Sequence, residues 1–509
     1  MPSVRGPSGA GSDFLTLDAA AAPVGGRTTW LATVLRTAIG QGRLRSGTRL
    51  PATRTLAAEL GFARGVVVQA YQRLIDEGLV AARTGVGTVV LPVEAPARNS
   101  STRVAVTKPT EPTKQTKPAN QAGDPREIPR LPLPTFDQDR PDLLDLSPGV
   151  PDLAAFPRAA WLRAERKVLA DLGAADLGYG DPRGSARLRA ELSGWLARNR
   201  GVQANPAQIL VVAGVAQALA LLAQTLRARG TTTLAVEDPG SYGARKQMTH
   251  WGLRPVPIPV DENGLQVEAL ERADVTAALL TPAHQFPTGV VLSPSRRRAL
   301  LDWARAGNLV IEDDYDAEHR YDRAPVRALQ SSAPEHVAHT GSTSKTLAPG
   351  MRLGWLVPPA DLYPDLVAAR HASDLGSPAL PQLVLAELLA GGGYDRHLRL
   401  VRNRQRRRRD AMLAALAEHL PGARVEGAAA GLHLLISFPG LPVETDDTDL
   451  ATAVRHADIR VHPLSWHRIQ PGPPGLVLGY AAHPPDRLQS AVRRMATALP
   501  SALRRNPNW

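Results

Sequence analysis

Short apolar runs alternate with amphipathic stretches through the C-terminal three-quarters of the chain. The runs end in Gly, Pro, Asp or Ser, and the amphipathic stretches that separate them include residues 215–228 and 293–306. Runs of this kind are typical of buried parallel strands, and the stretches between them of helices. We therefore expect a mainly parallel sheet covered by helices, with ligands at the strand ends. The runs are "QILVVAG" (208–214), "TTLAVEDPG" (232–240), "AALLTP" (277–282), "NLVIEDD" (308–314) and "HVAHTGS" (336–342).

The pattern near the N-terminus is different. "LPATRTLAAELGF" (50–62) predicts a short helix that ends at Gly61. "ARGVVVQAYQRLIDEGL" (63–79) predicts a second helix whose apolar face carries Val67, Ala70, Tyr71 and Leu74. "LVAARTGVGTVV" (79–90) then predicts a hairpin, or wing.

Residues 92–140 separate these two regions. They hold nine prolines and a single aromatic residue, Phe136. A segment this poor in apolar side chains buries too little surface to offset its ordering entropy, so we expect a flexible linker. The expected organisation is a disordered N-terminus (1–13), a small helical domain with a wing (14–91), the linker (92–140) and one large domain (141–509), without an internal repeat.

Composition narrows the class of protein. Of the 509 residues, 43% are hydrophobic and 21% charged, as in ordinary globular proteins. The net charge of +12 favours a polyanionic partner, with nucleic acid as the leading candidate. The lack of cysteine excludes disulfides and thiolate metal sites. The sequence shows neither a signal peptide nor an apolar run that would span a bilayer, so we expect a cytoplasmic protein.

The N-terminal segment is strongly basic. Residues 14–91 contain nine arginines and four acids, and Arg64, Gln69 and Arg73 lie on the polar face of the second predicted helix. A helix, a turn, a helix and a basic wing commonly place one helix in the major groove while arginines bind phosphates. The alternative is a small helical domain with a solvated basic face.

One lysine stands out in the large domain. Only Lys167, Lys246 and Lys345 lie beyond residue 140, and Lys345 follows a predicted strand, between serines and Arg352. Pyridoxal 5'-phosphate (PLP) needs a lysine amine for its aldimine, a carboxylate beside its ring nitrogen and a cradle for its phosphate. Asp313 ends a predicted strand, and Gly214 precedes a helix whose first N–H groups favour an anion.

Each of these features also has a structural explanation. A serine-rich loop with a lysine is usually only a loop. The acids of "EDDYDAEH" (312–319) can solvate a strand end or bind a divalent metal, but they lack a fixed ligand spacing and a histidine pair, so no metal is expected. The run "VRNRQRRRRD" (401–410) fits the solvated face of a long helix better than a second DNA-contacting patch.

The N-terminal segment resembles the winged helix-turn-helix of GntR-type bacterial regulators. The matching residues are "G-x-R-L-P-x-x-R-x-L-A-x-x-L-G" (47–61), several positions of the second helix and the wing's "G-x-G-T". The resemblance implies that Arg54 and Arg64 contact double-stranded DNA. The sequence departs from the family at Ala63 and Val66, where Ser and Thr are usual. The residues expected at the DNA are Arg49, Arg54, Arg64, Gln69, Arg73, Arg83, Gly85 and Gly87.

Residues 141–509 look like a fold-type I aminotransferase domain, and its fusion to a GntR-type head resembles the MocR subfamily. Seven stretches match in order, among them "GYGDPRGSARLR" (178–189), "TPAHQFPTGVVLS" (281–293) and "GSTSKTLAPGMRLGW" (341–355). The resemblance implies a homodimer in which Lys345 forms the aldimine, Asp313 faces the ring nitrogen and Tyr315 the ring oxygen. The residues it assigns to the cofactor are Lys345, Asp313, Tyr315, Ser342, Ser344, Arg352, Gly214, Val215, Ala216, Tyr179 and Tyr242.

Three departures bear on the function. Ser241 stands where an aromatic residue usually stacks on the cofactor, with Tyr242 one place later, and Val215 replaces a common serine. In "LVLGYAAH" (476–483), Ala482 stands where relatives that bind a substrate carboxylate tend to have arginine. Loss of a bidentate arginine weakens the case for an amino-acid ligand.

The sequence therefore predicts a transcriptional regulator whose aminotransferase-like domain senses PLP, or a small amine or amino acid that reacts with it, and controls vitamin B6 or amino-acid metabolism. One alternative is a working PLP-dependent aminotransferase with an accessory DNA-binding head. Another is a DNA-binding protein whose large domain is only a cofactor-free dimerisation scaffold.

Overall fold

The structure is a computed structural model that describes residues 19–23, 25–41, 43–83, 87–91, 143–316, 318–321 and 326–499. It separates into an N-terminal and a C-terminal unit. The segments expected to be a disordered N-terminus (1–13) and a linker (92–140) lie outside the described residues. No helix in the described ranges is both long and apolar enough to cross a membrane.

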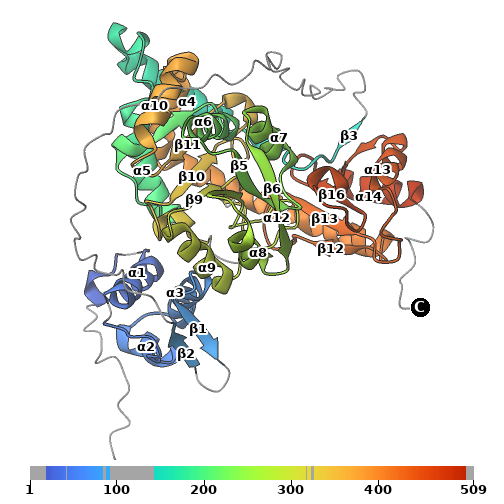
Figure 1. Ribbon diagram of the computed structural model, residues 1–509. Coiled ribbons are helices and arrows are strands. Elements are labelled where there is room, and N and C mark those ends of the chain that lie inside the picture. Colours follow the sequence, from blue (N-terminus) through green and yellow to red (C-terminus); the bar gives the residue numbers. More distant parts are fainter. Residues whose placement is uncertain are drawn as a thin grey trace, which may run out of the picture. The chain divides into compact units, whose positions relative to one another are not determined.

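The N-terminal unit is a three-helix domain with a two-stranded wing (Figure 1). The predicted apolar face of the third helix is confirmed, since Val67, Ala70, Tyr71 and Leu74 are all buried. Gly61 ends the second helix at φ 61°, a left-handed conformation that favours glycine. The elements are α1 (Arg27–Gly40), α2 (Thr53–Leu60), α3 (Arg64–Asp76), β1 (Val80–Arg83) and β2 (Gly87–Val90).

An eight-stranded sheet forms the centre of the C-terminal unit. Five neighbouring strands, from β10 to β6, are parallel, whereas β11 runs antiparallel to both β10 and β4. The predicted mainly parallel sheet is thus confirmed. Its strands are, in spatial order, β4 (Leu210–Val212), β11 (Gly354–Val357), β10 (Val337–Ser342), β9 (Leu309–Asp313), β8 (Ala277–Leu280), β5 (Thr233–Asp238), β6 (Arg254–Asp261) and β7 (Gly264–Leu265).

Helices cover both faces of this sheet, because successive strand residues point to opposite sides. On β4, Val211 packs in one core with Trp195 of α5, whereas Val212 packs in another with Leu222 of α6. The covering helices are α4 (Arg158–Asp171), α5 (Ala186–Arg200), α6 (Val215–Ala228), α7 (Tyr242–His250), α8 (Val267–Arg272), α9 (Pro294–Arg305), α10 (Tyr363–Asp374) and α11 (Ala379–Ala390). Both amphipathic stretches noted in the sequence are helices, α6 and α9.

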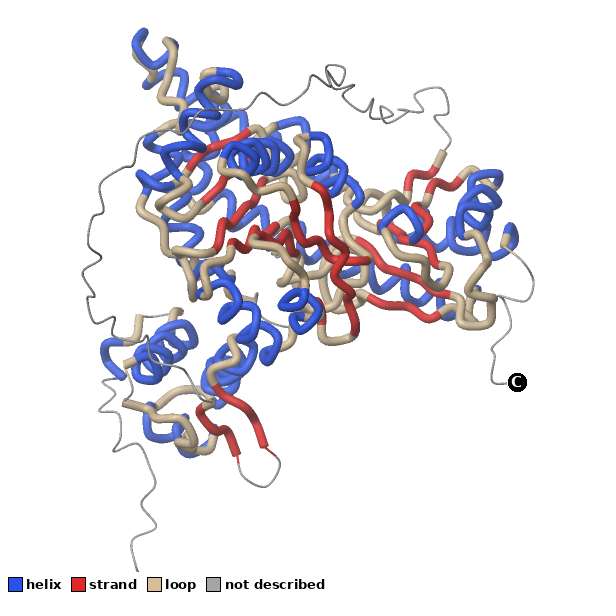
Figure 2. Tube along the Cα trace, in the orientation of Figure 1, coloured by secondary structure: helices blue, strands red, loops and turns tan. Residues whose placement is uncertain are grey.

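A smaller α+β subdomain follows the long helix α12 (Gly393–His419), as predicted (Figure 2). Its antiparallel sheet has the order β12-β13-β16-β15, and a short parallel pair joins β14 to β3 from the start of the unit. The remaining elements are β3 (Leu144–Asp145), β12 (Arg424–Glu426), β13 (His433–Ser437), α13 (Asp447–His456), β14 (Ile459–Arg460), β15 (His462–Pro463), β16 (Gly475–Gly479) and α14 (Pro485–Ala498).

The arginine-rich run 401–410 lies within α12. Arg406 and Arg407 are exposed, as expected for a solvated face, but Arg408 and Arg409 are buried. Arg408 pairs with Asp152 at 2.9 Å. The run thus supplies an exposed face of a long helix, as expected, while Arg408 and Arg409 turn towards the interior.

Candidate functional site

The predicted cofactor residues come from loops that leave one edge of the large sheet. Asp313 is the last residue of β9 and Ser342 the last of β10, and these two strands are parallel neighbours. Gly214 joins β4 to α6. Because parallel strands end at the same edge, these separate stretches of sequence reach one site.

The Lys345 side chain packs against the loop before α4. Its Nζ donates a hydrogen bond to the Gly149 carbonyl at 2.6 Å. Gly149 has φ +87°, and a Cβ added there would lie 2.9 Å from Nζ, so only glycine leaves room for the amine. Burial lowers the pKa of Lys345, although the charges of Asp316 and Asp313 oppose this. A lowered pKa favours the neutral amine, which is the nucleophile.

Asp313 lies nearby without a strong partner for its charge. Burial, followed by the charges of Asp314 and Asp316, raises the pKa of Asp313 to about 7. Its Oδ1 accepts a weak hydrogen bond from the Thr340 hydroxyl at 3.5 Å. A protonated ring nitrogen would supply the missing positive charge, so this carboxyl group fits the partner of a pyridine ring.

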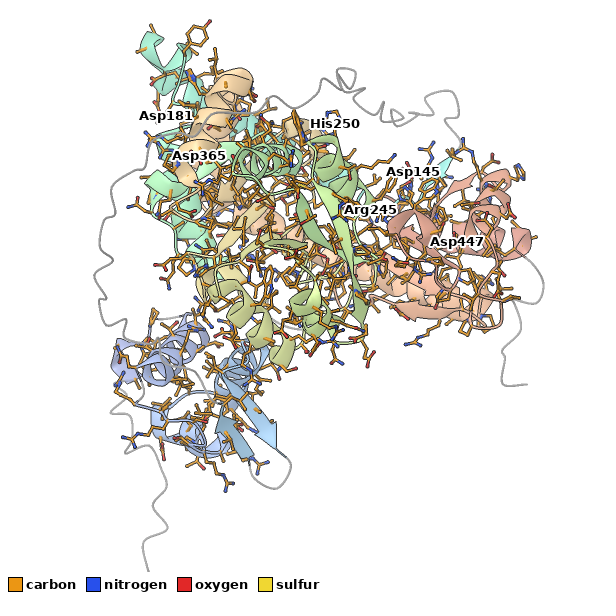
Figure 3. All side chains as sticks on the ribbon, in the orientation of Figure 1. Asp145, Asp181, Arg245, His250, Asp365 and Asp447 are labelled. Atoms are coloured by element: carbon orange, nitrogen blue, oxygen red, sulfur yellow. The ribbon has the colours of Figure 1, made fainter. Side chains whose placement is uncertain are left out.

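A pocket opens beside Asp313, between strands β5 and β8 and the start of α7. Glu237, on its wall, accepts hydrogen bonds from the backbone and hydroxyl of Thr281, and burial raises its pKa to about 7. The guanidinium of Arg245, a residue labelled in Figure 3, donates a hydrogen bond to the Trp466 carbonyl at 2.9 Å. The pocket is lined by Val236, Glu237, Ser241, Ala244, Arg245, Leu279, Leu280, Thr281 and Asp313.

The expected phosphate cradle is assembled around Gly214. This glycine has φ +82°, and a Cβ added there would lie 3.1 Å from the Arg352 guanidinium, which donates to the Ala213 carbonyl. Val215 and Ala216 begin α6, where backbone N–H groups have no partner within the helix. Ser342 accepts a hydrogen bond from the Ser344 backbone at 3.3 Å. An arginine beside a helix N-terminus suits a phosphate.

Tyr315 belongs to a buried polar cluster that our sequence reasoning missed. Its hydroxyl lies 2.9 Å from His284 Nδ1, and the same nitrogen lies 2.9 Å from Asp316 Oδ2. The His433 ring lies beside that of His284, with centroids 5.3 Å apart. His284, Asp316 and His433 lie in three of the seven matched stretches, residues 281–293, 311–318 and 431–435, and this was the only signal in the sequence.

Two further predicted residues are Tyr242 and Tyr179. The Tyr242 ring contacts two cations, with Lys246 Nζ 4.4 Å from its centroid, whereas Ser241 lines the pocket and caps α7. Tyr179 is 96% exposed. Contact of either tyrosine with the cofactor stays a prediction.

Several of the predicted DNA residues are exposed on the N-terminal unit. Arg54, Arg64 and Gln69 are exposed on α2 and α3, whose apolar faces form the core. Arg49 forms an isolated antiparallel β-bridge with Val89 of the wing. Its guanidinium lies close to Gly87, where an added Cβ would be 3.1 Å from it.

Arg73 differs from expectation. It is half-buried, and its guanidinium donates to the Thr29 hydroxyl of α1 at 2.9 Å. It therefore ties α3 to α1 instead of standing on the outward face. Gly85 and the side chain of Arg83 lie outside the described part of the chain.

Comparisons with known proteins support both halves of this assignment. Residues 30–90 match the family of bacterial regulatory proteins of the gntR type, and residues 141–495 match aminotransferase class I and II. The chain is 32% identical to the pyridoxine biosynthesis transcriptional regulator PdxR of Corynebacterium glutamicum, over 92% of this chain and 95% of the relative. The chain is a MocR-type regulator of the GntR family.

Other members of this family align over nearly the whole chain. The probable rhizopine catabolism regulatory protein MocR of Rhizobium meliloti is 32% identical, over 91% of this chain and 92% of its own length. The regulator TauR of Rhodobacter capsulatus is 30% identical, over 90% and 93% respectively. The MocR-type architecture predicted from the sequence is thereby confirmed.

Solved aminotransferases share the fold of the C-terminal unit. The kynurenine aminotransferase of Pyrococcus horikoshii, solved in complex with PMP, superposes with a TM-score of 0.66 at 25% identity, over 72% of this chain and 93% of that one. The α-aminoadipate aminotransferase LysN of Thermus thermophilus gives 0.64 at 28% identity, over 71% and 93%. The MocR-type regulator thus carries a complete aminotransferase fold.

Proposed function

We propose that this MocR-type regulator binds PLP at Lys345 and that cofactor binding changes its affinity for operator DNA. The observation that carries the proposal is the meeting of three elements: a lysine amine with a lowered pKa, a carboxyl group without a strong cationic partner, and an arginine beside a helix N-terminus. When bound, PLP supplies an aldehyde that reacts with amines and a ring that withdraws electrons.

Each residue of the chain has a distinct role in this proposal. Lys345 provides the amine that holds the cofactor covalently, and Asp313 keeps a proton at the ring nitrogen. Arg352 and the backbone N–H groups after Gly214 bind the phosphate. The apolar residues of β5 and β8 that line the pocket exclude water from the ring.

DNA binding belongs to the N-terminal unit. Exposed Arg54 and Arg64 fit contacts to DNA, and Arg49 places a third cation on the wing. Because its partner is DNA of a bacterial regulon, we infer that the protein acts in the cytoplasm.

We further infer a homodimer, which would let two heads bind paired operator sites. Apolar side chains are exposed on and after α4, including Leu162, Leu169, Leu177 and Tyr179. Exposed apolar side chains of this size mark an interaction surface when they gather together. A second copy covering them would also bring Tyr179 towards the neighbouring cofactor.

PLP itself is the ligand that the site favours as the signal. Near Ala482, Arg408 donates to the Ala481 carbonyl and is already paired with Asp152, which also binds Arg404 at 2.7 Å. These cations are therefore engaged, and none replaces the missing arginine that would hold an amino-acid carboxylate. Control of vitamin B6 metabolism follows from this choice, and the PdxR relative is named for the same process.

The test is a DNA-binding titration of the purified dimer on its own upstream region, with and without PLP, for the wild type and Lys345→Ala. We expect PLP to change the affinity or footprint of the wild type and to leave Lys345→Ala unaffected. Unchanged DNA binding by a wild type that holds PLP would refute sensing. Steady turnover of an amino donor with a keto acid would instead favour the aminotransferase alternative, and failure to bind PLP would favour the scaffold.

A further inference from the structure

Tyr315 belongs to a hydrogen-bond network with two residues, His284 and Asp316, that the proposed function has not used. Its hydroxyl lies 2.9 Å from His284 Nδ1, and that nitrogen also lies 3.1 and 2.9 Å from the two oxygens of Asp316. The side chains of His284 and Asp316 are 2% and 1% exposed. Water therefore has little access to this group, and the three side chains must satisfy one another.

The direction of these bonds follows from the charge on Asp316. Burial alone would raise the pKa of Asp316, but the charge and hydrogen bond of His284 keep it below its usual value. An ionised carboxylate only accepts, so His284 Nδ1 must carry a hydrogen. Tyr315 then faces an N–H donor, and its oxygen accepts.

The other ring nitrogen of His284 offers no competing arrangement. His284 Nε2 is buried without a hydrogen-bond partner among the described residues. A Cβ added at Gly289 would lie 3.2 Å from Nε2, and one at Gly431 would lie 2.0 Å from the adjacent ring carbon. The ring is thus wedged against glycine backbone. A hydrogen on Nε2 would lack an acceptor there, at a cost of about 1–3 kcal/mol. While Asp316 is ionised, Nδ1 therefore carries a hydrogen whether the ring is neutral or charged.

The same packing speaks against a metal ion at this place. His284, Asp316 and His433 bring one ligand atom each within 4.8 Å of one another, which is a spacing suited to a metal. However, Nδ1 of His284 is already bonded and Nε2 meets backbone. His433 Nε2 lies 3.2 Å from the Pro287 carbonyl, to which it can donate. The cluster is better explained as a hydrogen-bond network.

We propose that His284 and Asp316 are positioning residues that hold Tyr315 as a hydrogen-bond donor towards the ring oxygen of PLP. This inference rests on the proposed binding of PLP at Lys345. With its oxygen accepting from His284, Tyr315 can direct its hydroxyl hydrogen to Asp316 or, when PLP is bound, to the ring oxygen of the cofactor. Burial raises the pKa of Tyr315 well above its usual value, so the hydroxyl keeps its hydrogen.

The expected consequence is a shift in the protonation of the nitrogen that joins Lys345 to the cofactor. A hydrogen bond donated to the ring oxygen weakens that oxygen's attraction for the neighbouring proton, which lowers the pKa of the nitrogen. Other titratable groups that interact with Tyr315 or His284 are Asp313, Glu237, His319 and His433. Burial lowers the pKa of His319 to about 4 and that of His433 to about 3, so both stay neutral in a titration near neutrality.

The experiment is a pH titration of the visible absorbance of the full-length protein loaded with PLP. We expect Asp316→Asn to raise the midpoint by about one pH unit, because His284 can then accept the hydrogen of Tyr315 and withdraw it from the cofactor. A simple charge effect has the opposite sign, since removing a nearby anion lowers the pKa of a cation. The direction of the shift therefore separates positioning from charge.

Three further variants complete the design. Tyr315→Phe should raise the midpoint at least as far as Asp316→Asn. His284→Asn, whose amide N–H can replace Nδ1–H, should stay near the wild type, and so should His433→Gln, which alters a neighbour that does not bond to Tyr315. A lowered or unchanged midpoint in Asp316→Asn would overturn the inference while leaving PLP binding intact. A wild type that takes up no PLP would refute the proposed function itself.

Discussion

Replacing Asp313 by asparagine should have opposite effects on stability and on cofactor binding. Burial raises the pKa of this carboxyl from 3.8 to about 7. The folded protein therefore binds a proton more tightly than the unfolded chain does. The free energy of unfolding of the protein falls as the pH rises from about 4 to about 7, and the full loss of stability is present above pH 7. The difference of about 3 pH units corresponds to an upper limit of about 4 kcal/mol.

Asp313→Asn removes this cost, so the cofactor-free variant should resist urea better than the wild type above neutral pH, by on the order of 2–4 kcal/mol. The amide, however, cannot stabilise a protonated ring nitrogen. A hydrogen bond to a charged group contributes about 1.5–3 kcal/mol, so PLP should bind about 10- to 100-fold more weakly. Urea unfolding and absorbance titration measure the two effects.

Asp314, the neighbouring residue, provides a matched control. Its carboxylate pairs with buried Arg200 at 2.5 Å. Asp313 lines the pocket, whereas Asp314 does not. Asp314→Asn should destabilise the protein by about 3–5 kcal/mol, because it leaves a buried cation without its partner. If Asp313→Asn is destabilised in the same way, or binds PLP as tightly as the wild type, the assignment of Asp313 to the ring nitrogen is refuted.

Three other changes test separate parts of the molecule. Arg352→Gln should weaken PLP about tenfold or more without affecting unphosphorylated pyridoxal in the same absorbance titration. Arg54→Ala should weaken DNA binding and reduce the salt dependence by about one counterion, measured by fluorescence anisotropy. Burial lowers the pKa of His433 to about 3, so the wild type loses stability as the pH falls below about 6.5. His433→Gln should lose about 2 kcal/mol less in urea unfolding between pH 7 and pH 5.

The sequence predicted the strands and helices whose pattern is local. The stretch 215–228 is helix α6 within the same limits, and "NLVIEDD" contains β9. Strand β6 was missed because three prolines, Pro255, Pro257 and Pro259, interrupt its pattern. Prolines lack the N–H that a central strand needs. Alternate residues of a strand direct their backbone groups to the same neighbouring strand. The prolines are tolerated here because Val256 and Ile258, which lie between them, stand in the ladder with β5.

The candidate site likewise contains residues that the sequence predicted and contacts that it did not. Lys345, Asp313 and Arg352 were predictable because each sits in a distinctive stretch at a strand end. The bond between His284 and Asp316 joins residues 32 apart, and neither hydrophobic period nor spacing marks it. Likewise, the polar face of a predicted helix did not reveal that Arg73 binds Thr29 of α1. Side-chain partners of this kind depend on how loops and helices pack, which sequence periodicity does not encode.

The surroundings of Ala482 bear on the proposal that PLP itself is the signal. An aminotransferase must hold each incoming amino acid by its carboxylate, and a free arginine beside the cofactor would serve that purpose. In this chain Arg408 lies next to that place but is neutralised by Asp152 and anchored to the Ala481 carbonyl. Freeing it would leave buried Asp152 with Arg404 as its remaining ionic partner. Among the described residues near Ala482, Arg408 is thus already paired, which agrees with the proposal that PLP and not an amino acid is the ligand sensed.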